Sequence, residues 1–183
     1  MSLININLEK SLHTDLLIKV FHLTWNTYLN CWSMIKRKVK ILGTILHELN
    51  SCDEFWFSVA FVTTDGLATL IETLHNLNGR GIKGKILVSQ YLNFTQPEAL
   101  KRLLKFSNIE TKIAVDSAFH SKGYLFKKNE TYNLIIGSSN LTASALCSNV
   151  EWNLKITATP ISHIIFNAIK EFTTEFEKPL MST

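Results

Sequence analysis

The sequence predicts a single α/β domain in which a β-sheet is flanked by helices, and three observations carry this prediction. The chain has 183 residues, 46% of them hydrophobic, which is enough to bury the core of one ordinary domain. From Glu54 onward, short β-rich runs alternate with helical stretches, as they do in α/β sheets. At residues 128–131, a short polar turn joins two β-rich runs directly, which predicts an antiparallel hairpin.

The N-terminal part of the chain differs from the rest. Residues 8–50 contain no proline and place apolar residues at helical spacings, which predicts two helices, with the basic residues 36–38 between them or at the start of the second. The predicted strands after them cover residues 55–62, 83–90, 109–115, 119–128, 132–139 and 150–158. The predicted helices cover residues 65–77, 97–106, 141–146 and 162–177. Asp65 is expected to cap the first of these helices, and Pro97 fits the first turn of the second.

Charge and cysteine content restrict the class of protein only loosely. The net charge of +4 favours a polyanionic partner, although weakly. Cys31, Cys52 and Cys147 are widely spaced and form no CxxC pair, which indicates reduced thiols and neither a disulfide framework nor a zinc site. The N-terminus does not resemble a signal peptide, and no apolar run reaches about 18 residues. We therefore expect a cytoplasmic protein without a membrane partner.

Candidate chemistry begins with His120-Ser121-Lys122, which lies in one of the predicted strands. Because side chains alternate between the two faces of a strand, His120 and Lys122 project together while Ser121 points away. An imidazole can attack phosphorus, and a nearby ammonium can hold phosphate oxygens whose charge increases in the transition state. This pair is therefore a candidate phosphodiester site.

Two further segments can complete such a site. The next predicted strand ends in Gly137-Ser138-Ser139-Asn140, where small residues let the backbone turn tightly and approach a ligand. Asn140 begins a predicted helix, and a helix N-terminus favours anions, so a phosphate is expected to dock there. Downstream, Glu151 lies at the start of another predicted strand, where its carboxylate can orient the histidine or act as its base partner.

The order His-x-Lys, Gly-Ser-Ser-Asn, Glu resembles the catalytic signature of the phospholipase D superfamily, in the variant found in its metal-independent nucleases and related restriction endonucleases. The segments AFVTTDGL, VSQYLNFTQPEAL, FHSKGYLF and GSSNLTASAL also resemble the phospholipase D-like domain associated with bacterial superfamily 2 helicases and restriction systems. The resemblance spans roughly residues 40–175. It implies a phospholipase D-like fold with a central mixed β-sheet flanked by helices, in a domain covering 40–178 after an N-terminal helical extension, 1–39.

The resemblance also implies a role for each site residue. His120 is expected to be the nucleophile that forms a phosphohistidine, or the general acid when the opposite half-site supplies it. Lys122 and Asn140 are expected to bind phosphate oxygens, with support from Ser138. Glu151 is expected to hydrogen-bond to the imidazole and orient it.

Ser139 and Lys127 are further candidates for substrate binding. Lys127 stands where the commonest form of the family motif has an Asp; because the nuclease variant also lacks that Asp, the departure argues mainly against a lipid phospholipase. No cofactor or metal is expected, because the remaining histidines have no ligand-like spacing. These histidines are His13, His22, His47, His75 and His163. The aromatic residues of the first β-rich run after Glu54, Phe55, Trp56, Phe57 and Phe61, are interpreted as core residues.

Three functions fit these residues. The first is a metal-independent phosphodiesterase that cleaves DNA through a phosphohistidine, as the nuclease module of a helicase or restriction protein. The second is a non-catalytic module that binds DNA phosphates for an attached helicase. The third, a phosphatidyl transferase, is disfavoured because no membrane-facing helix or hydrophobic anchor is evident.

The single His-x-Lys copy predicts an oligomer. A displacement through phosphohistidine needs one histidine to attack and another to protonate the leaving oxygen. We expect a two-fold homodimer with a shared active site, because a two-fold axis brings the same surface of both subunits together. The alternatives are a complementary half-site elsewhere in a longer protein, and a monomer that binds without cutting.

Overall fold

The structure is a computed structural model that describes residues 3–7, 40–89, 94–114 and 118–178. The strands are β1 (Leu3–Asn7), β2 (Glu54–Val59), β3 (Lys83–Val88), β4 (Ile109–Ile113), β5 (Lys122–Lys128), β6 (Thr131–Gly137) and β7 (Asn153–Ala158). The helices are α2 (Ile41–Ser51), α3 (Thr64–Ala68), α4 (Ile71–Gly79), α5 (Pro97–Leu103), the π-helix η2 (Ser144–Ser148) and α6 (His163–Phe176). Of these helices, none combines the length and the apolar run that a membrane crossing needs.

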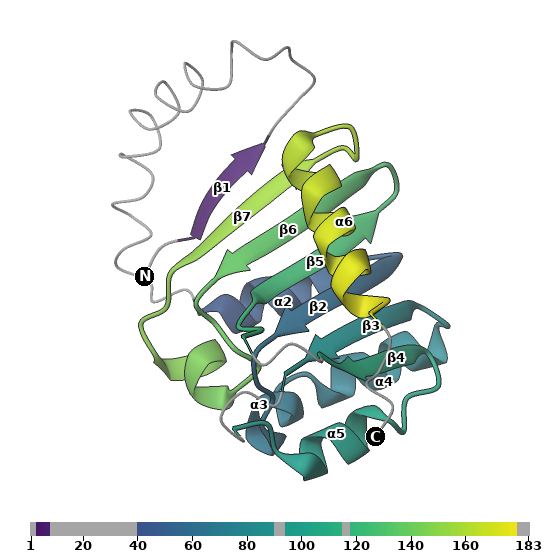
Figure 1. The fold of residues 1–183 in the computed structure, drawn as a ribbon, viewed down its shortest axis with the longest axis vertical. Helices are drawn as coiled ribbons and strands as arrows, with labels where there is room; N and C mark the ends of the chain where they lie inside the picture. The colour runs from purple at the N-terminus through teal and green to yellow at the C-terminus, as the bar shows by residue number, and fades with distance from the viewer. Residues whose placement is uncertain (1–2, 8–39, 90–93, 115–117, 179–183) are drawn as a thin grey trace.

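The strands form one seven-stranded sheet in the order β1-β7-β6-β5-β2-β3-β4 (Figure 1). β2, β3 and β4 are parallel, as the alternation of strands and helices predicted. β5, β6 and β7 pair in antiparallel fashion, and β5 is also antiparallel to β2. The expected mixed sheet flanked by helices in a single domain is confirmed.

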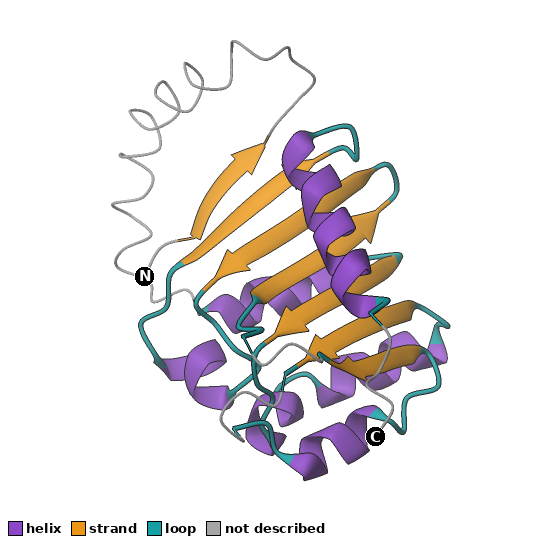
Figure 2. Cartoon of the chain, in the orientation of Figure 1, coloured by secondary structure: helices purple, strands orange, loops and turns teal. Residues whose placement is uncertain are grey.

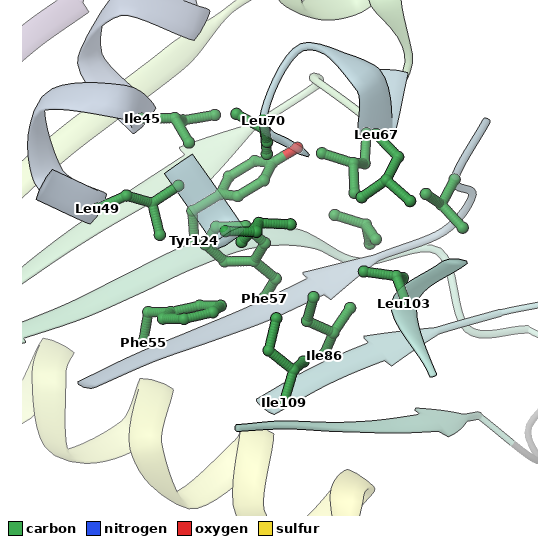
Figure 3. Packing of buried hydrophobic residues seen from close by; sticks show 14 of the residues in the cluster. Ile45, Leu49, Phe55, Phe57, Leu67, Leu70, Ile86, Leu103, Ile109 and Tyr124 are labelled. Carbon is green, nitrogen blue, oxygen red and sulfur yellow. The ribbon is translucent and has the colours of Figure 1, made fainter. Parts of the chain in front are cut away.

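The two faces of the sheet are covered unequally. Figures 1 and 2 show α2 to α5 on one face and α6 lying across the other. The larger core lies under α2 to α5, where Phe57 and Tyr124 pack edge to face with ring centroids 4.9 Å apart (Figure 3). A smaller cluster under α6 contains Leu125, Leu134 and Ile165. The alternating burial of β2 follows from this arrangement, since its successive side chains face different layers.

The helix expected at 65–77 is two helices, α3 and α4. The hydroxyl of Thr69 donates to the carbonyl of Gly66 at 2.7 Å, a local bond that competes with continued helical pairing at the end of α3. The N-cap of α3 is Thr63, whose hydroxyl accepts from the Gly66 N–H, so the expected cap at Asp65 was wrong by two residues, because Asp65 lies inside the first turn of α3. Pro97 occupies the first turn of α5 as predicted.

The N-terminal range expected to be a helical extension contains a strand. β1 pairs in parallel with β7, which makes it an edge strand of the sheet. The second of the two expected N-terminal helices corresponds to α2. The first, together with the basic residues 36–38, falls outside the described residues.

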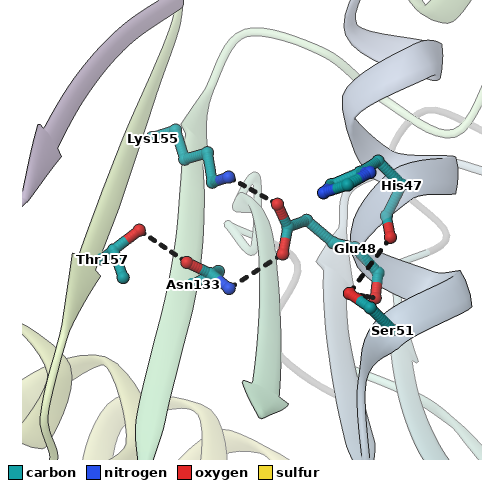
Figure 4. A network of polar contacts seen from close by, with 6 residues as sticks. All are labelled: His47, Glu48, Ser51, Asn133, Lys155 and Thr157. Atoms are coloured by element: carbon teal, nitrogen blue, oxygen red, sulfur yellow. Dashed lines mark hydrogen bonds and ion pairs between the residues drawn. The ribbon is translucent and has the colours of Figure 1, made fainter.

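A polar network replaces apolar packing where α2 crosses β6 and β7 (Figure 4). The buried carboxylate of Glu48 pairs with the Lys155 ammonium and accepts a hydrogen bond of 2.8 Å from the Asn133 amide. The Asn133 oxygen in turn accepts from the Thr157 hydroxyl at 2.5 Å. The network thus links a helix to two strands, and its buried groups have partners.

We expect Glu48→Ala to lower the free energy of unfolding by about 3 kcal/mol, because Lys155 and Asn133 lose their shared acceptor in a mostly buried position. The double variant Glu48→Leu/Lys155→Met should recover part of this loss, since it removes both charges together. Urea unfolding followed by circular dichroism measures both effects. A wild-type midpoint for Glu48→Ala would show that the network does not stabilise the fold.

Candidate active site

The predicted site residues gather where the hairpin strands meet one end of the sheet. β5 and β7 begin there and β2 and β6 end there, because β5 is antiparallel to β2 and β6, and β7 is antiparallel to β6. The last paired residues are Val59 with Lys122 and Gly137 with Asn153. Residues 119–121, 138–139 and 150–152, which were expected to extend the strands, lie beyond these pairs. His120, Ser138 and Glu151 therefore lie in the connections at the sheet end.

His120 and Lys122 are in contact, although His120 precedes β5. The Lys122 Nζ lies 2.9 Å from Nδ1 and 3.1 Å from Nε2 of the imidazole, and it donates to the His120 carbonyl at 2.8 Å. The His120 side chain is exposed, whereas Lys122 is half-buried. Partial burial lowers the pKa of Lys122 from its usual value, and the charge of Glu151 opposes this shift. The structure thus brings a reactive imidazole and an incompletely solvated ammonium together.

Glu151 is held by the loop residues around it. Its Oε2 accepts a hydrogen bond from the Ser138 hydroxyl, and its Oε1 accepts one of 3.2 Å from the Asn149 amide. The backbone of Trp152 fixes Ser138 in turn, since the Ser138 N–H donates to the Trp152 carbonyl at 2.9 Å. Ser138 and Glu151, predicted from separate motifs, therefore form one unit.

Ser139 and Asn140 lie deeper than Ser138. Ser139 is fully buried, its hydroxyl accepts from the Asn153 amide at 2.8 Å, and its carbonyl accepts from the Tyr124 hydroxyl at 2.9 Å. Burial raises the pKa of Tyr124, which keeps this donor protonated. In this arrangement Ser139 joins strands and does not reach a ligand from solvent. The oxygen of the buried Asn140 amide accepts from the Phe61 N–H at 3.3 Å, which links the segments that follow β6 and β2.

Lys127 is not part of this cluster. It lies near the opposite end of β5, paired with Glu54 on one side and Tyr132 on the other. A strand rises about 3.3 Å per residue, so Lys127 is roughly 16 Å along β5 from Lys122. It also alternates to the other face of the sheet. The expected contact with substrate at the site is therefore not supported by its position.

Phe61 was interpreted from sequence as a core residue, but it lies at the site. Its ring is 6.0 Å from the His120 ring and 5.9 Å from the Lys122 Nζ. The exposed Phe94 also packs against Phe61, with ring centroids 5.4 Å apart. No sequence signal separates Phe61 from the buried aromatic residues that precede it in the same run. It differs from them only because the pairing of β2 with β5 ends at Val59, before Phe61.

Lys40 is a second residue that sequence reasoning missed. Its ammonium donates to the carbonyls of Ser148 and Asn149 at 2.7 and 3.3 Å. Since the Asn149 side chain binds Glu151, Lys40 fastens the loop that carries the site carboxylate to the start of α2.

A pocket of about 340 Å³ opens on the other side of His120, between α6 and the sheet. Its walls include Trp56 and Phe172, and the carboxylates of Glu171 and Glu175 line it. Within the described residues, the lining contains no lysine or arginine. Glu175 is paired with the Lys178 ammonium at 2.6 Å, so Glu171 is the carboxylate that repels a polyanion in this pocket, and phosphate is favoured on the Lys122 side of the imidazole.

The cluster has the parts of one half of a phosphodiester site. The exposed imidazole is of a type that can attack phosphorus, the ammonium next to it can stabilise negative charge, and the Glu151 carboxylate acts electrostatically on that ammonium. Among the described residues, no three His, Cys, Asp or Glu side chains are grouped as ligands for a metal ion.

Comparison with protein families gives one match that covers most of the chain. A family model described as "Cardiolipin synthase, PLD-like domain" matches residues 45–179. A search of curated proteins gives no match.

Solved structures with a similar fold come from several bacteria. NucT from Helicobacter pylori has a TM-score of 0.56 and 18% identity, over 74% of this chain and 87% of that one. Nuc from Salmonella typhimurium, described as a phospholipase D family member, has a TM-score of 0.52 and 18% identity, over 74% and 86%. The phosphatidylserine synthase of Haemophilus influenzae Rd KW20 has a TM-score of 0.54 and 13% identity, over 73% and 35%. At these identities the likeness concerns the fold.

We expect Gly137→Ala to destabilise the sheet end by about 1–3 kcal/mol, because the added Cβ would lie 2.0 Å from the Trp152 carbonyl oxygen and 2.7 Å from the Asn153 Cα. The matched control is Gly123→Ala in β5, whose Cβ would meet nothing nearer than an Ile136 methyl at 3.9 Å. Urea unfolding of both variants tests this. Equal stability of the two would show that the close approach at Gly137 does not constrain the site.

Proposed function

The chain belongs to the phospholipase D-like family, and we propose from this premise that it is a metal-independent phosphodiesterase that cleaves nucleic acid through a phosphohistidine. The observation that carries the proposal is the contact of the Lys122 ammonium with the His120 imidazole at 2.9 Å, next to the Ser138–Glu151 unit. The order of the motifs is the one that the family resemblance implies. The contact brings together an imidazole and an ammonium, which are the two groups that the proposed chemistry uses. The proposal also includes that the chain is the nuclease module of a helicase or restriction protein. This part is supported only by the sequence segments that resemble such proteins.

In the proposed mechanism, an imidazole nitrogen of His120 attacks phosphorus, and a P–N bond forms as the bond to the leaving oxygen breaks. A second histidine donates its proton to that oxygen, then accepts one from the water that cleaves the P–N bond. Lys122 holds a non-bridging oxygen whose charge grows in the transition state. Asn140 is suited to a second oxygen, because an amide whose oxygen is engaged keeps its N–H donors.

Glu151 is proposed to act through electrostatics on the charged form of the site. It favours the protonated form of Lys122. Orientation of the His120 imidazole by the same carboxylate, which the family resemblance implies, is part of the proposal. Ser138 and Asn149 hold the carboxylate, so its direction does not depend on the substrate.

The family description and the fold shared with a phosphatidylserine synthase also favour a second candidate, phosphatidyl transfer. Nucleic acid is preferred as substrate because the chain is basic, with a net charge of +4, and because the sequence resembles the nuclease variant of the motif. A non-catalytic DNA-binding module remains the alternative if the cluster binds phosphate without turnover.

We expect His120→Ala to abolish cleavage of labelled DNA while its affinity for DNA stays within a few fold, because the nucleophile acts mainly in the chemical step. Cleavage by the wild type should persist in EDTA. The matched control is His163→Ala at the start of α6, which should cleave at the wild-type rate. Cleavage by His120→Ala would remove His120 as nucleophile, and turnover of phosphatidyl vesicles in place of DNA would favour the lipid candidate.

A homodimer with a shared active site is part of the proposal. Within the chain only one His-x-Lys occurs, so the second histidine has to come from another copy or another segment. His120 and Ser138 are exposed, and the exposed Val150 and Trp152 flank Glu151. An open site with an apolar border is suited to contact with a second copy.

Mixing wild type with His120→Ala tests the shared site. If both histidines act on one phosphate, the activity of co-refolded mixtures should be proportional to the square of the wild-type fraction, because only dimers with two wild-type subunits cleave. Sedimentation of the same samples gives the oligomeric state. A linear loss of activity, or full activity in a monomer, would show that one chain supplies everything that catalysis needs.

A further inference from the structure

The exposed ring of Phe94 is not explained by the core or by the chemistry at His120. It is 56% exposed, and it packs against Phe61, which packs against His120. Phe61 thus contacts both the exposed Phe94 ring and the exposed His120 imidazole, and the Lys122 ammonium lies over the Phe61 ring, 5.9 Å from its centroid. We propose that Phe94 and Phe61 form a stacking platform for a base next to the scissile phosphate, which makes single-stranded nucleic acid the favoured substrate. This inference rests on the proposed function.

The backbone around Phe94 is anchored although its ring is exposed. Directly after it, the Thr95 hydroxyl donates to the Ser89 carbonyl at 2.6 Å, and the Gln96 N–H donates to the Val62 carbonyl at 2.9 Å. The Gln96 side chain also accepts from the Thr64 N–H at 2.8 Å. The ring is therefore held at the surface by the fold, and ordering it for a ligand costs little conformational entropy.

Charge determines which part of a nucleotide lies on each side of His120. Phosphate is favoured next to the Lys122 ammonium, and Glu171 disfavours it in the pocket on the α6 side, where Glu175 is already paired with Lys178. A base joined through one sugar to a phosphate at Lys122 reaches the neighbouring ring of Phe61 and then Phe94. Aromatic rings beside a cation are the combination that single-strand binding proteins use, because every base has a face that can stack.

A duplex does not offer such a face, since its bases already stack on one another. A single strand does, and base–aromatic stacking contributes about 1–3 kcal/mol per base. The platform therefore predicts a difference between substrates that depends on the base and not on the phosphate. This difference separates stacking from general electrostatic attraction, which acts on the backbone alone.

The test is a double-mutant cycle that combines removal of the Phe94 ring with removal of the bases from the strand. Binding is measured by fluorescence anisotropy, in the non-cleaving His120→Ala background, for oligo(dT) and for an abasic strand of the same length. Adding Phe94→Ala should weaken oligo(dT) binding by about 5- to 150-fold, the range that the stacking free energy gives. Binding of the abasic strand should change less than about twofold, and Phe94→Trp should restore the affinity for oligo(dT).

The matched control is Phe166→Ala, because Phe166 is also 56% exposed but lies in the first turn of α6, which follows the far end of β7. It should leave both affinities unchanged. An equal loss on both strands after Phe94→Ala overturns the platform while leaving the proposed function intact. A loss of dimer sedimentation, or of binding to anionic phospholipid vesicles, without the base-dependent effect also overturns it, since Phe94 would then contact a second copy or a bilayer. If the parent protein binds neither strand, the proposed function fails together with the platform.

Discussion

The antiparallel ladder of β5, β6 and β7 is the constraint on which the site depends. Its register brings the start of β5, the end of β6 and the start of β7 to one end of the sheet. Gly137 opposite Asn153 closes the ladder, and without a Cβ there the chain after β6 comes close enough for Ser138 to bind Glu151. A slip of one residue would turn each side chain of the moved strand to the other face. The Glu48–Asn133–Lys155 network opposes such a slip, because its partners come from α2, β6 and β7.

Burial and charge act in opposite directions on Lys122. Partial burial disfavours its ammonium form and lowers its pKa, while the carboxylate of Glu151 favours that form. The loss of hydration therefore affects the Lys122 ammonium more than the negative charge of Glu151 does. A bound phosphate supplies the missing negative charge, so an anion gains affinity from the same burial that is unfavourable in the free protein. The placement of Glu151 on Ser138 and Asn149 limits how far the carboxylate can move to neutralise Lys122 on its own.

Much of the fold and part of the site could be predicted because they follow from local periodicity. The β/α alternation predicted the parallel strands. The contact between His120 and Lys122 was also predicted, although not for the right reason, because His120 lies before β5 and not in the strand. The ends of the strands were harder to predict, because the pairing of two strands stops at a point that depends on both of them. β5 begins at Lys122 because its partner β2 ends at Val59. For the same reason, the sequence did not show that Phe61, two residues after the end of β2, lies at the site. Lys127 was misplaced because a motif position says which residue type is expected but not how far along a strand it projects.

The surroundings of His120 are asymmetric, and this asymmetry restricts how a second subunit can complete the site. Glu171 and Glu175 line the pocket toward α6. The Lys122 ammonium instead lies over the ring of Phe61, which packs against Phe94. In the proposed in-line displacement the leaving oxygen lies opposite the attacking nitrogen, so the proposed second histidine approaches across the phosphate, from another copy or another segment. A strand lying along Lys122 and Phe94 leaves that approach open. The proposed two-fold partner and the proposed nucleic acid substrate are therefore compatible, because each would use a different border of the same sheet end.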